Sequence, residues 1–306
     1  MNEKNLKCPV CNSKNIIIKY REGKEKPSLE IGYARAGVIS ELYKCKGCGV
    51  KFTNVLINFD KNIYASGNDV IYKRSERARK LTFKKDIENL LKKFRGAKGG
   101  ILDVGCGPGY FLEIVKEKGF KADGIDLSTA DCAEANSKGL NVYCTDFMNF
   151  CEKNKDKKYD LITMWDFIEH VENPQEVMVN CHNILNIDGK LVISTPDAGS
   201  LFAKIMGRRW WNLLSMHLLY FNKRSIKYLL ENNGFRVLDI GSYSRILNIK
   251  HGLNWLNRYP GLFKIAEFFI ALLGIDKLNL PLNFFDSMIV YAEKKEPLSK
   301  QGHLAL

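Results

Sequence analysis

The sequence of 306 residues lacks any apolar run long enough to span a bilayer. Its first residues, M-N-E-K-N-L-K, also lack the apolar core of a signal peptide. These absences predict a cytoplasmic protein. In that reducing compartment, its nine cysteines are expected to be metal ligands or buried thiols rather than disulfides.

Acidic side chains are scarce in the first 100 residues, which carry 23 Lys+Arg against 10 Asp+Glu, whereas residues 101–306 carry 24 of each. The whole net charge of +13 is therefore N-terminal. Nucleic acid, an anionic membrane surface or a phosphorylated substrate would suit this asymmetry. One basic cluster falls on a predicted helix and is expected to face solvent, with a phosphate-binding surface as the alternative: Lys73, Arg74, Arg77, Arg79, Lys80, Lys84 and Lys85.

The stretch from Ile101 to Tyr110, I-L-D-V-G-C-G-P-G-Y, predicts a buried strand, a glycine turn and a helix. Glycines allow the backbone to approach a ligand closely because they have no Cβ. The turn lacks the last glycine of the dinucleotide fingerprint, since position 110 is Tyr. It also lacks the Lys-Ser or Lys-Thr pair that holds a triphosphate, so both ligands are disfavoured.

Two acids follow the next two predicted strands, Asp126 in A-D-G-I-D-L-S and Asp146 in N-V-Y-C-T-D-F. Ligands of open α/β sheets bind at the carboxyl ends of the strands, so both acids should face the crevice of the glycine turn. A carboxylate at the first position suits a ribose diol.

Residues 101–147 resemble the class I S-adenosylmethionine-dependent methyltransferases. The resemblance implies that Gly105, Gly107 and Gly109 pass the methionine part of the cofactor and that Asp103 holds its amino group. It further implies that Asp126, beside Leu127, binds the ribose hydroxyls and that Asp146 and Phe147 border the adenine.

The segment W-D-F-I-E-H-V-E-N-P follows the fourth predicted strand, Tyr159 to Met164. It resembles the E-H-V-x-x-P segment of methyltransferases related to the ubiquinone-biosynthesis O-methyltransferases and to sugar C-methyltransferases. Helical spacing would let Asp166, Glu169 and His170 project to one side. A later pattern of the same group, H-x-x-Y-F, adds His217 on the substrate side. The candidate general bases are, in order, His170, His217, Glu169 and Asp166, with a structural hydrogen bond as the alternative for His170.

Two C-x-x-C pairs, Cys8 with Cys11 and Cys45 with Cys48, predict a structural Cys₄ zinc site in a small ribbon. The ribbon strands are expected at Ile16 to Tyr20, Glu41 to Lys44 and Lys51 to Leu56. A redox C-x-x-C is the rival interpretation, but it needs only one pair.

The predicted fold is α/β: a doubly wound, mostly parallel sheet of seven strands, the last antiparallel, behind the zinc-ribbon module. The expected parts are the module (1–58), a helical cover over the cofactor site (59–100), the methyltransferase domain (101–296) and a loose tail (297–306). An insertion at 244–285 carries a broad apolar helical stripe. We expect the stripe to pack within the protein. A second subunit, or a peripheral membrane contact through 255–275, stays open.

The predicted function is methyl transfer from S-adenosylmethionine to an oxygen or carbon of a small, nucleotide-linked or lipid-linked acceptor, with a sugar as one candidate. Two alternatives remain: an RNA methyltransferase that binds RNA through the basic module, and a non-catalytic zinc-ribbon binding protein. The neutral charge of residues 101–306 and the absence of an Asn/Asp-Pro-Pro-Tyr motif after the fourth strand disfavour nucleic acid.

Overall fold

The computed structural model describes residues 6–21, 41–53, 73, 75–94, 100–249, 260–274 and 278–295. The strands are β1 (Ile16–Tyr20), β2 (Leu42–Cys45), β3 (Lys51–Thr53), β4 (Ile101–Val104), β5 (Ala122–Asp126), β6 (Asn141–Cys144), β7 (Tyr159–Trp165), β8 (Leu185–Pro196), β9 (Leu219–Tyr220), β10 (Phe235–Ser242), β11 (Arg245–Asn248), β12 (Asn279–Leu282) and β13 (Ser287–Lys294). The helices are α3 (Glu76–Lys93), α4 (Tyr110–Glu117), α5 (Thr129–Ser137), α6 (Phe147–Lys153), α7 (Pro174–Ile184), α8 (Leu201–Met206), α9 (Lys223–Glu231) and α11 (Pro260–Leu273), with 3₁₀ turns η2 (Ile168–His170) and η3 (Gly207–Arg209).

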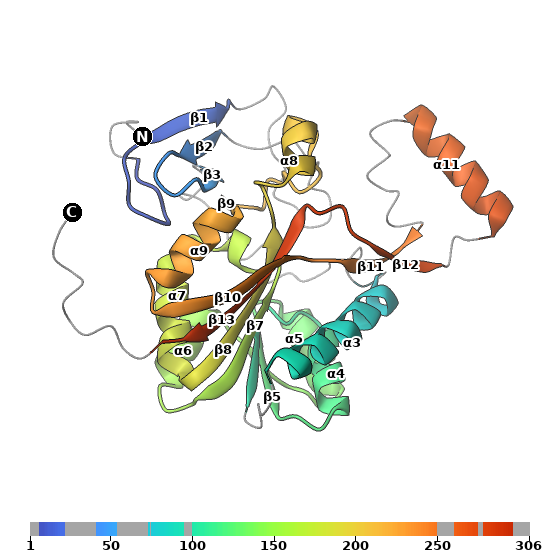
Figure 1. Ribbon diagram of the computed structural model, residues 1–306. Helices are drawn as coiled ribbons and strands as arrows, with labels where there is room; N and C mark the ends of the chain where they lie inside the picture. The colour runs from blue at the N-terminus through green and yellow to red at the C-terminus, as the bar shows by residue number, and fades with distance from the viewer. Residues whose placement is uncertain are drawn as a thin grey trace.

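A seven-stranded sheet in the order β10-β13-β8-β7-β4-β5-β6 forms the body of the protein. β13 runs antiparallel to both of its neighbours, while β8, β7, β4, β5 and β6 pair in parallel. Helices α3, α4 and α5 cover one face, and α6, α7 and α9 cover the other (Figure 1). With both faces covered, every residue of the central strand β4 is buried. The predicted fold is confirmed.

The fifth predicted strand, Gly189 to Ser194, is longer in the structure, where β8 runs from Leu185 to Pro196. The extra length follows from pairing with β7, because Leu185 lies opposite Tyr159 before the register shifts. The side chain of Asn186 fixes this start by donating to Asp160, at 2.6 Å.

The N-terminal strands are continuous with the body that the seven-stranded sheet forms. β1, β2 and β3 form the predicted antiparallel ribbon, and β9 extends it to four strands. Lys51 and Phe52 pair with Tyr220 and Leu219. Side chains of the module also belong to the same hydrophobic cluster as α7 and α9. The predicted module boundary at residue 58 and the tail at 297–306 lie outside the described residues.

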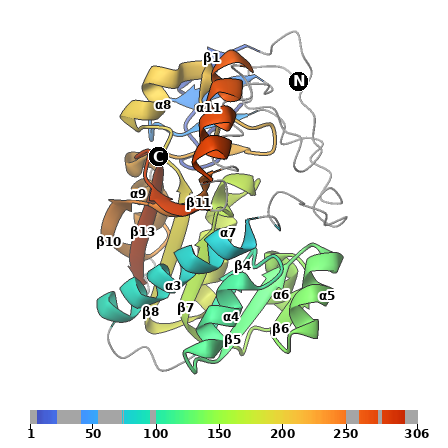
Figure 2. The same ribbon diagram turned by 90° about the vertical axis from the view of Figure 1, so that its right-hand side faces the viewer.

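The insertion differs from its prediction. β11 and β12 form a two-stranded hairpin, and α11 stands beyond it, to the right of the sheet in Figure 1 and toward the viewer in Figure 2. Phe268 and Leu272 of α11 are 64% and 67% exposed. Packing of this stripe within the protein is therefore wrong for the described side chains. Trp255, Leu256 and Tyr259 lie outside the described residues.

The helix before the glycine turn, α3, packs beside α4 and the end of β7. The ring of Phe83 lies 5.5 Å from those of both Phe111 and Trp165. The predicted cover begins at residue 59, but residues 54–72 lie outside the described part. No residue of the described helix α3 lines the cavity at the carboxyl ends of β4 to β7.

Gly109 generates a test of the fold. An added Cβ would lie 2.4 Å from Leu140 Cδ1, and φ is +81°. At Gly119, φ is +83° but no atom lies within 4 Å of the added Cβ. We expect Gly119→Ala to lose about 1 to 2 kcal/mol through left-handed strain alone. Gly109→Ala should lose roughly 1 to 3 kcal/mol more through overpacking. Urea unfolding measures both, and equal losses would contradict this packing role.

Candidate active site

A cavity of about 330 Å³ opens at the carboxyl ends of β4, β5, β6 and β7. Its volume falls in the usual range for small-molecule sites. Five predicted cofactor residues line it: Gly105, Asp126, Leu127, Asp146 and Phe147. Parallel strands bring their ends to one edge of the sheet, which is why residues so far apart in sequence meet here.

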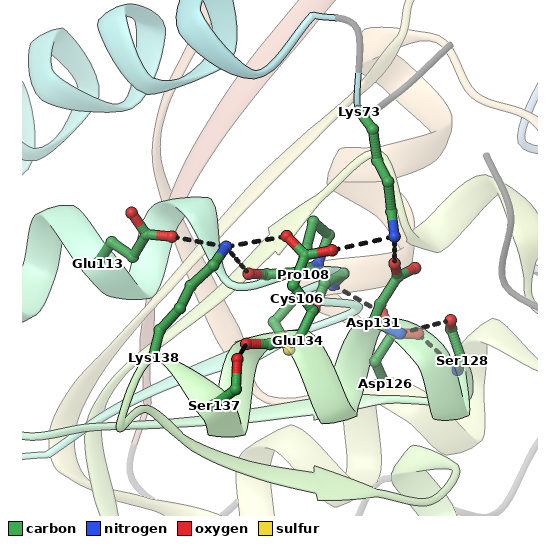
Figure 3. A network of polar contacts seen from close by, with 11 residues as sticks. Lys73, Cys106, Pro108, Glu113, Asp126, Ser128, Asp131, Glu134, Ser137 and Lys138 are labelled. Atoms are coloured by element: carbon green, nitrogen blue, oxygen red, sulfur yellow. Dashed lines mark hydrogen bonds and ion pairs between the residues drawn. The ribbon is translucent and has the colours of Figure 1, made fainter. Parts of the chain in front are cut away.

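Asp126 connects the glycine turn to the second strand. Its two carboxylate oxygens accept the backbone N–H groups of Gly107, at 2.7 Å, and Ser128, at 2.8 Å (Figure 3). Burial raises the pKa of Asp126, against the opposing effect of these two bonds. Each oxygen keeps further acceptor capacity for a ligand hydroxyl.

The three glycines of the turn do different things. Gly105 lines the cavity, and a Cβ there would lie 2.9 Å from the ring of Phe167. Gly107 holds Asp126 through its N–H. Gly109 packs against Ala135 of α5 and Leu140 after it, and these two side chains leave no room for a Cβ at position 109. Neither Gly107 nor Gly109 is among the cavity-lining residues.

Asp103 lies beneath the turn and not on the cavity wall. It is buried and accepts a hydrogen bond from Thr163 Oγ1 at 2.7 Å. Burial raises its pKa to about 7. At the next acid, Asp146, the side chain caps α6 by accepting the Asn149 N–H at 3.0 Å.

A polar group lies where β7 ends. Asp166 lines the cavity with φ of +53°, a left-handed conformation that Asp adopts more readily than most residues. Its carboxylate pairs with the Arg245 guanidinium at 2.5 Å. Sequence reasoning missed Arg245, which falls inside the predicted insertion and belongs to no motif.

Asp166 and His170 line the cavity, but Glu169 does not. The prediction that all three side chains project to one side of the chain is therefore wrong for Glu169. The chain forms a 3₁₀ turn there and not a full helix. Glu169 is buried and accepts from Thr195 Oγ1 at 3.0 Å. Burial, with the nearby Asp166 charge, raises its pKa to about 8, so the carboxyl is largely protonated at neutral pH.

The two predicted histidines meet, with ring centroids 4.8 Å apart. His170 Nδ1 lies 3.0 Å from the Met216 carbonyl oxygen, and His217 Nδ1 lies 2.8 Å from that of Asn212. Burial lowers the pKa of both rings, and that of His217 is further lowered by His170. Both are therefore neutral. A carbonyl only accepts, so Nδ1 carries the proton and Nε2 the basic lone pair.

Comparison with known proteins identifies the family. A family model described as "Methyltransferase domain" matches residues 73–240, more than half of the chain. The chain belongs to this family.

Among curated proteins, the chain is similar to the ubiquinone biosynthesis O-methyltransferase of Coxiella burnetii, at 29% identity over 153 residues, 46% of this chain and 64% of that protein. The protein of the same name from Glaesserella parasuis is 35% identical over 105 residues, 31% of this chain and 44% of that protein. The chain thus spans less than two thirds of the length of either relative.

Two solved structures share the fold. One is a SAM-dependent methyltransferase from Archaeoglobus fulgidus, with TM-score 0.51 and 22% identity over 73% of this chain and 99% of that chain. The other is the plantazolicin methyltransferase BpumL in complex with SAH, with TM-score 0.51 and 19% identity over 78% of this chain and 92% of that chain. Sheet order and family together make this a class I S-adenosylmethionine-dependent methyltransferase fold.

An ion-pair network connects Lys73 with α4 and α5 beside the glycine turn (Figure 3). The Lys73 Nζ atom lies 3.2 Å from a carboxylate oxygen of Asp131 and 3.0 Å from one of Glu134, and both acids belong to α5. Lys80 pairs with Glu113 of α4. The prediction that this basic cluster faces solvent is wrong for these two lysines, because α4 and α5 present acids to them.

Four cysteine sulfurs gather beside the methyltransferase domain. Cys8, Cys11, Cys45 and Cys48 place their Sγ atoms within 4.8 Å of one another. The Cys8–Cys48 and Cys11–Cys45 separations are 3.6 and 3.5 Å. A tetrahedral zinc with bonds of about 2.3 Å needs sulfurs roughly 3.8 Å apart, so the donor set fits zinc. The described residues also bring ligand atoms of Glu169, His170 and His217 within 4.8 Å of one another.

Proposed function

We propose that the protein transfers the methyl group of S-adenosylmethionine to an oxygen or carbon of a small acceptor, nucleotide-linked or lipid-linked, with a sugar as a candidate. The observation that carries the proposal is the cavity in which Gly105, Asp126 and Asp146 converge. The curated relatives, named as O-methyltransferases of ubiquinone biosynthesis, support a small-molecule acceptor.

In the proposed cofactor pose, Asp126 accepts the ribose hydroxyls and Leu127 lies beside it. Asp146 and Phe147 border the adenine, and Gly105 passes the methionine part. Asp103 acts from beneath, because Thr163 holds its carboxyl behind the turn. The sulfonium is already an activated methyl donor, so the protein's main task is to align the acceptor with it.

For the proton, we favour His170 over the other candidates. It lines the cavity, it is neutral, and its basic nitrogen is Nε2. His217 has the same tautomer but no place on the cavity wall, so it acts as a positioning residue. Glu169 is a poor base because it holds its proton near neutral pH. Asp166 is neutralised by Arg245.

The proposed role of the four cysteines is to bind a structural zinc. Their sulfur separations support this, and a closed Cys₄ set leaves no open coordination position for chemistry. Zinc would stabilise a ribbon too short to build its own core. Since β3 pairs with β9, the ion would also support the segment that carries His217.

For α11, we propose that it lies in a membrane interface, which would suit a lipid-linked acceptor. Ile265, Phe268, Phe269, Leu272 and Leu273 are all more than half exposed. Apolar surface of this extent is unusual on a monomeric protein unless it contacts a partner or lipid. No helix in the described ranges has the length and apolarity needed to cross a bilayer.

Asp126→Ala should weaken binding of S-adenosylhomocysteine roughly 10- to 100-fold, because hydrogen bonds to a charged group contribute about 1.5 to 3 kcal/mol. Isothermal titration measures the change. Asp123→Ala is the matched control on the same strand, since Asp123 binds Lys157 and Tyr159 outside the cavity. Absence of heat with the wild-type protein, or equal affinity in both variants, would argue against the cofactor assignment.

Cys45→Ser should lower the zinc content from one ion per chain toward zero, because it removes one of the four ligands. The thermal midpoint should also fall, because the ribbon that the zinc stabilises contains β3, which pairs with β9. Elemental analysis and thermal unfolding measure both. Cys144→Ser, an exposed cysteine outside the cluster, should change neither. Zinc retained by Cys45→Ser would remove the metal assignment.

Phe268→Glu combined with Leu272→Glu should reduce sedimentation with phosphatidylcholine vesicles at least about tenfold, because burying each such side chain contributes roughly 1.5 to 3 kcal/mol. The control is Ile187→Glu, since Ile187 is 80% exposed near the start of β8, far from α11 in sequence. Wild-type protein that stays in the supernatant would refute the membrane role.

A further inference from the structure

A second polar pocket lies where the cysteine module meets the methyltransferase domain, and we name it the junction pocket. It has a volume of about 660 Å³ and is walled by β1 to β3, the turn after β8 and the start of α9. One acidic side chain, Asp197, lines it. Six cationic side chains also line it: Lys19, Lys44, Lys51, Lys204, Lys223 and Arg224.

In the described part of the chain, none of the six cations forms an ion pair within 4.0 Å, and Asp197 is the one acid among the pocket-lining residues. The hydrogen bonds found for them go to backbone carbonyls. Lys51 Nζ donates to the Ala198 oxygen at 3.1 Å, and Arg224 donates to the Gly47 oxygen at 2.7 Å. Lys73 and Lys80, by contrast, pair with acids. The junction pocket therefore concentrates positive potential.

Lys51 is the most enclosed of these groups. Burial, followed by repulsion from Lys19 and Lys44, lowers its pKa to about 8. Lys223 and Arg224 occupy the first turn of α9, which contains no acid, although the helix dipole favours acids there. Burying Lys51 and placing two cations at the start of α9 both cost free energy. A bound anion would offset that cost.

We propose that the junction pocket binds a phosphate or diphosphate group and that this group belongs to the methyl acceptor, an inference that rests on the proposed function. Two chain segments link the pocket to the candidate active site. Asp197 follows two residues after Thr195, which contacts Glu169. β9, whose partner strand carries Lys51, begins two residues after His217. On this proposal, an acceptor held there by its phosphates extends along these two segments toward the candidate active site. Nucleotide-linked and lipid-linked acceptors share this chemistry.

Calorimetric titration of the full chain with pyrophosphate tests the site. Wild type should bind it saturably at one site. Lys204→Gln combined with Lys223→Gln should weaken binding about tenfold or more, because each lysine contributes a charge-assisted hydrogen bond. Both lysines are exposed, so the fold should persist. Lys227→Gln, exposed on the same helix but outside the pocket, should bind like wild type. No binding, or equal binding in the double variant, would overturn the proposal.

Two further probes separate the sources of the phosphate. Uridine diphosphate that binds more tightly than pyrophosphate, with the same loss in the double variant, supports a nucleotide-linked acceptor. Wild type that binds phosphatidylcholine vesicles more tightly when they contain phosphatidic acid, with this gain lost in the double variant, supports a lipid-linked one. Failure of both probes overturns the assignment of the pocket to the acceptor.

S-adenosylhomocysteine binding separates this inference from the proposed function. The double variant should bind it with wild-type affinity, since neither lysine lines the cofactor cavity. Cofactor binding without pyrophosphate binding in wild type removes the junction pocket and leaves the methyltransferase proposal intact. Pyrophosphate binding without cofactor binding removes the proposed function, and with it the assignment of the phosphate to a methyl acceptor.

Discussion

The site depends above all on one partly buried carboxylate that binds two backbone amides. Asp126 joins the glycine turn after β4 to the start of α5 through the N–H groups of Gly107 and Ser128. Three glycines of this turn, Gly105, Gly107 and Gly109, have positive φ, and the charge-assisted bonds to Asp126 restrain the loop that they form. Burial makes the carboxylate costly when it is unpaired. Satisfying it with main-chain donors therefore fixes both loops in the geometry that forms the cavity wall.

The cysteine module and the candidate catalytic groups are mechanically one unit. β9 pairs with β3 on one side, and Leu218 donates its N–H to the Glu169 carbonyl at 2.9 Å. His217 precedes this short strand and packs against His170. A ribbon fixed by a metal can hold this strand in register, which a two-residue strand could not do alone. The module thus supports the histidine pair of the candidate active site through backbone pairing.

Sequence reasoning was most successful where geometry is local. Gly105, Asp126 and Asp146 reach the cavity because each follows a parallel strand, and strand ends converge by construction. Arg245 could not be predicted as the partner of Asp166, since that contact depends on how distant segments fold back beside β7. The pairing of β9 with β3 could not be predicted either, because β9 consists of only two residues, Leu219 and Tyr220, too few to show a strand pattern. For α11, an apolar stripe indicates that something covers it, but not what.

Among the described N-terminal residues, two groups of cations differ in their chemistry. Lys73 forms ion pairs with Asp131 and Glu134, and Lys80 with Glu113. These lysines therefore connect the segment before the glycine turn to α4 and α5. In the junction pocket, Lys19, Lys44 and Lys51 face further cations from α8 and α9. A backbone-binding surface for RNA would spread exposed cations along a stripe. In the junction pocket, six cationic side chains line one concave site, and one of them, Lys51, is largely enclosed. This arrangement suits a compact anion better than a polymer.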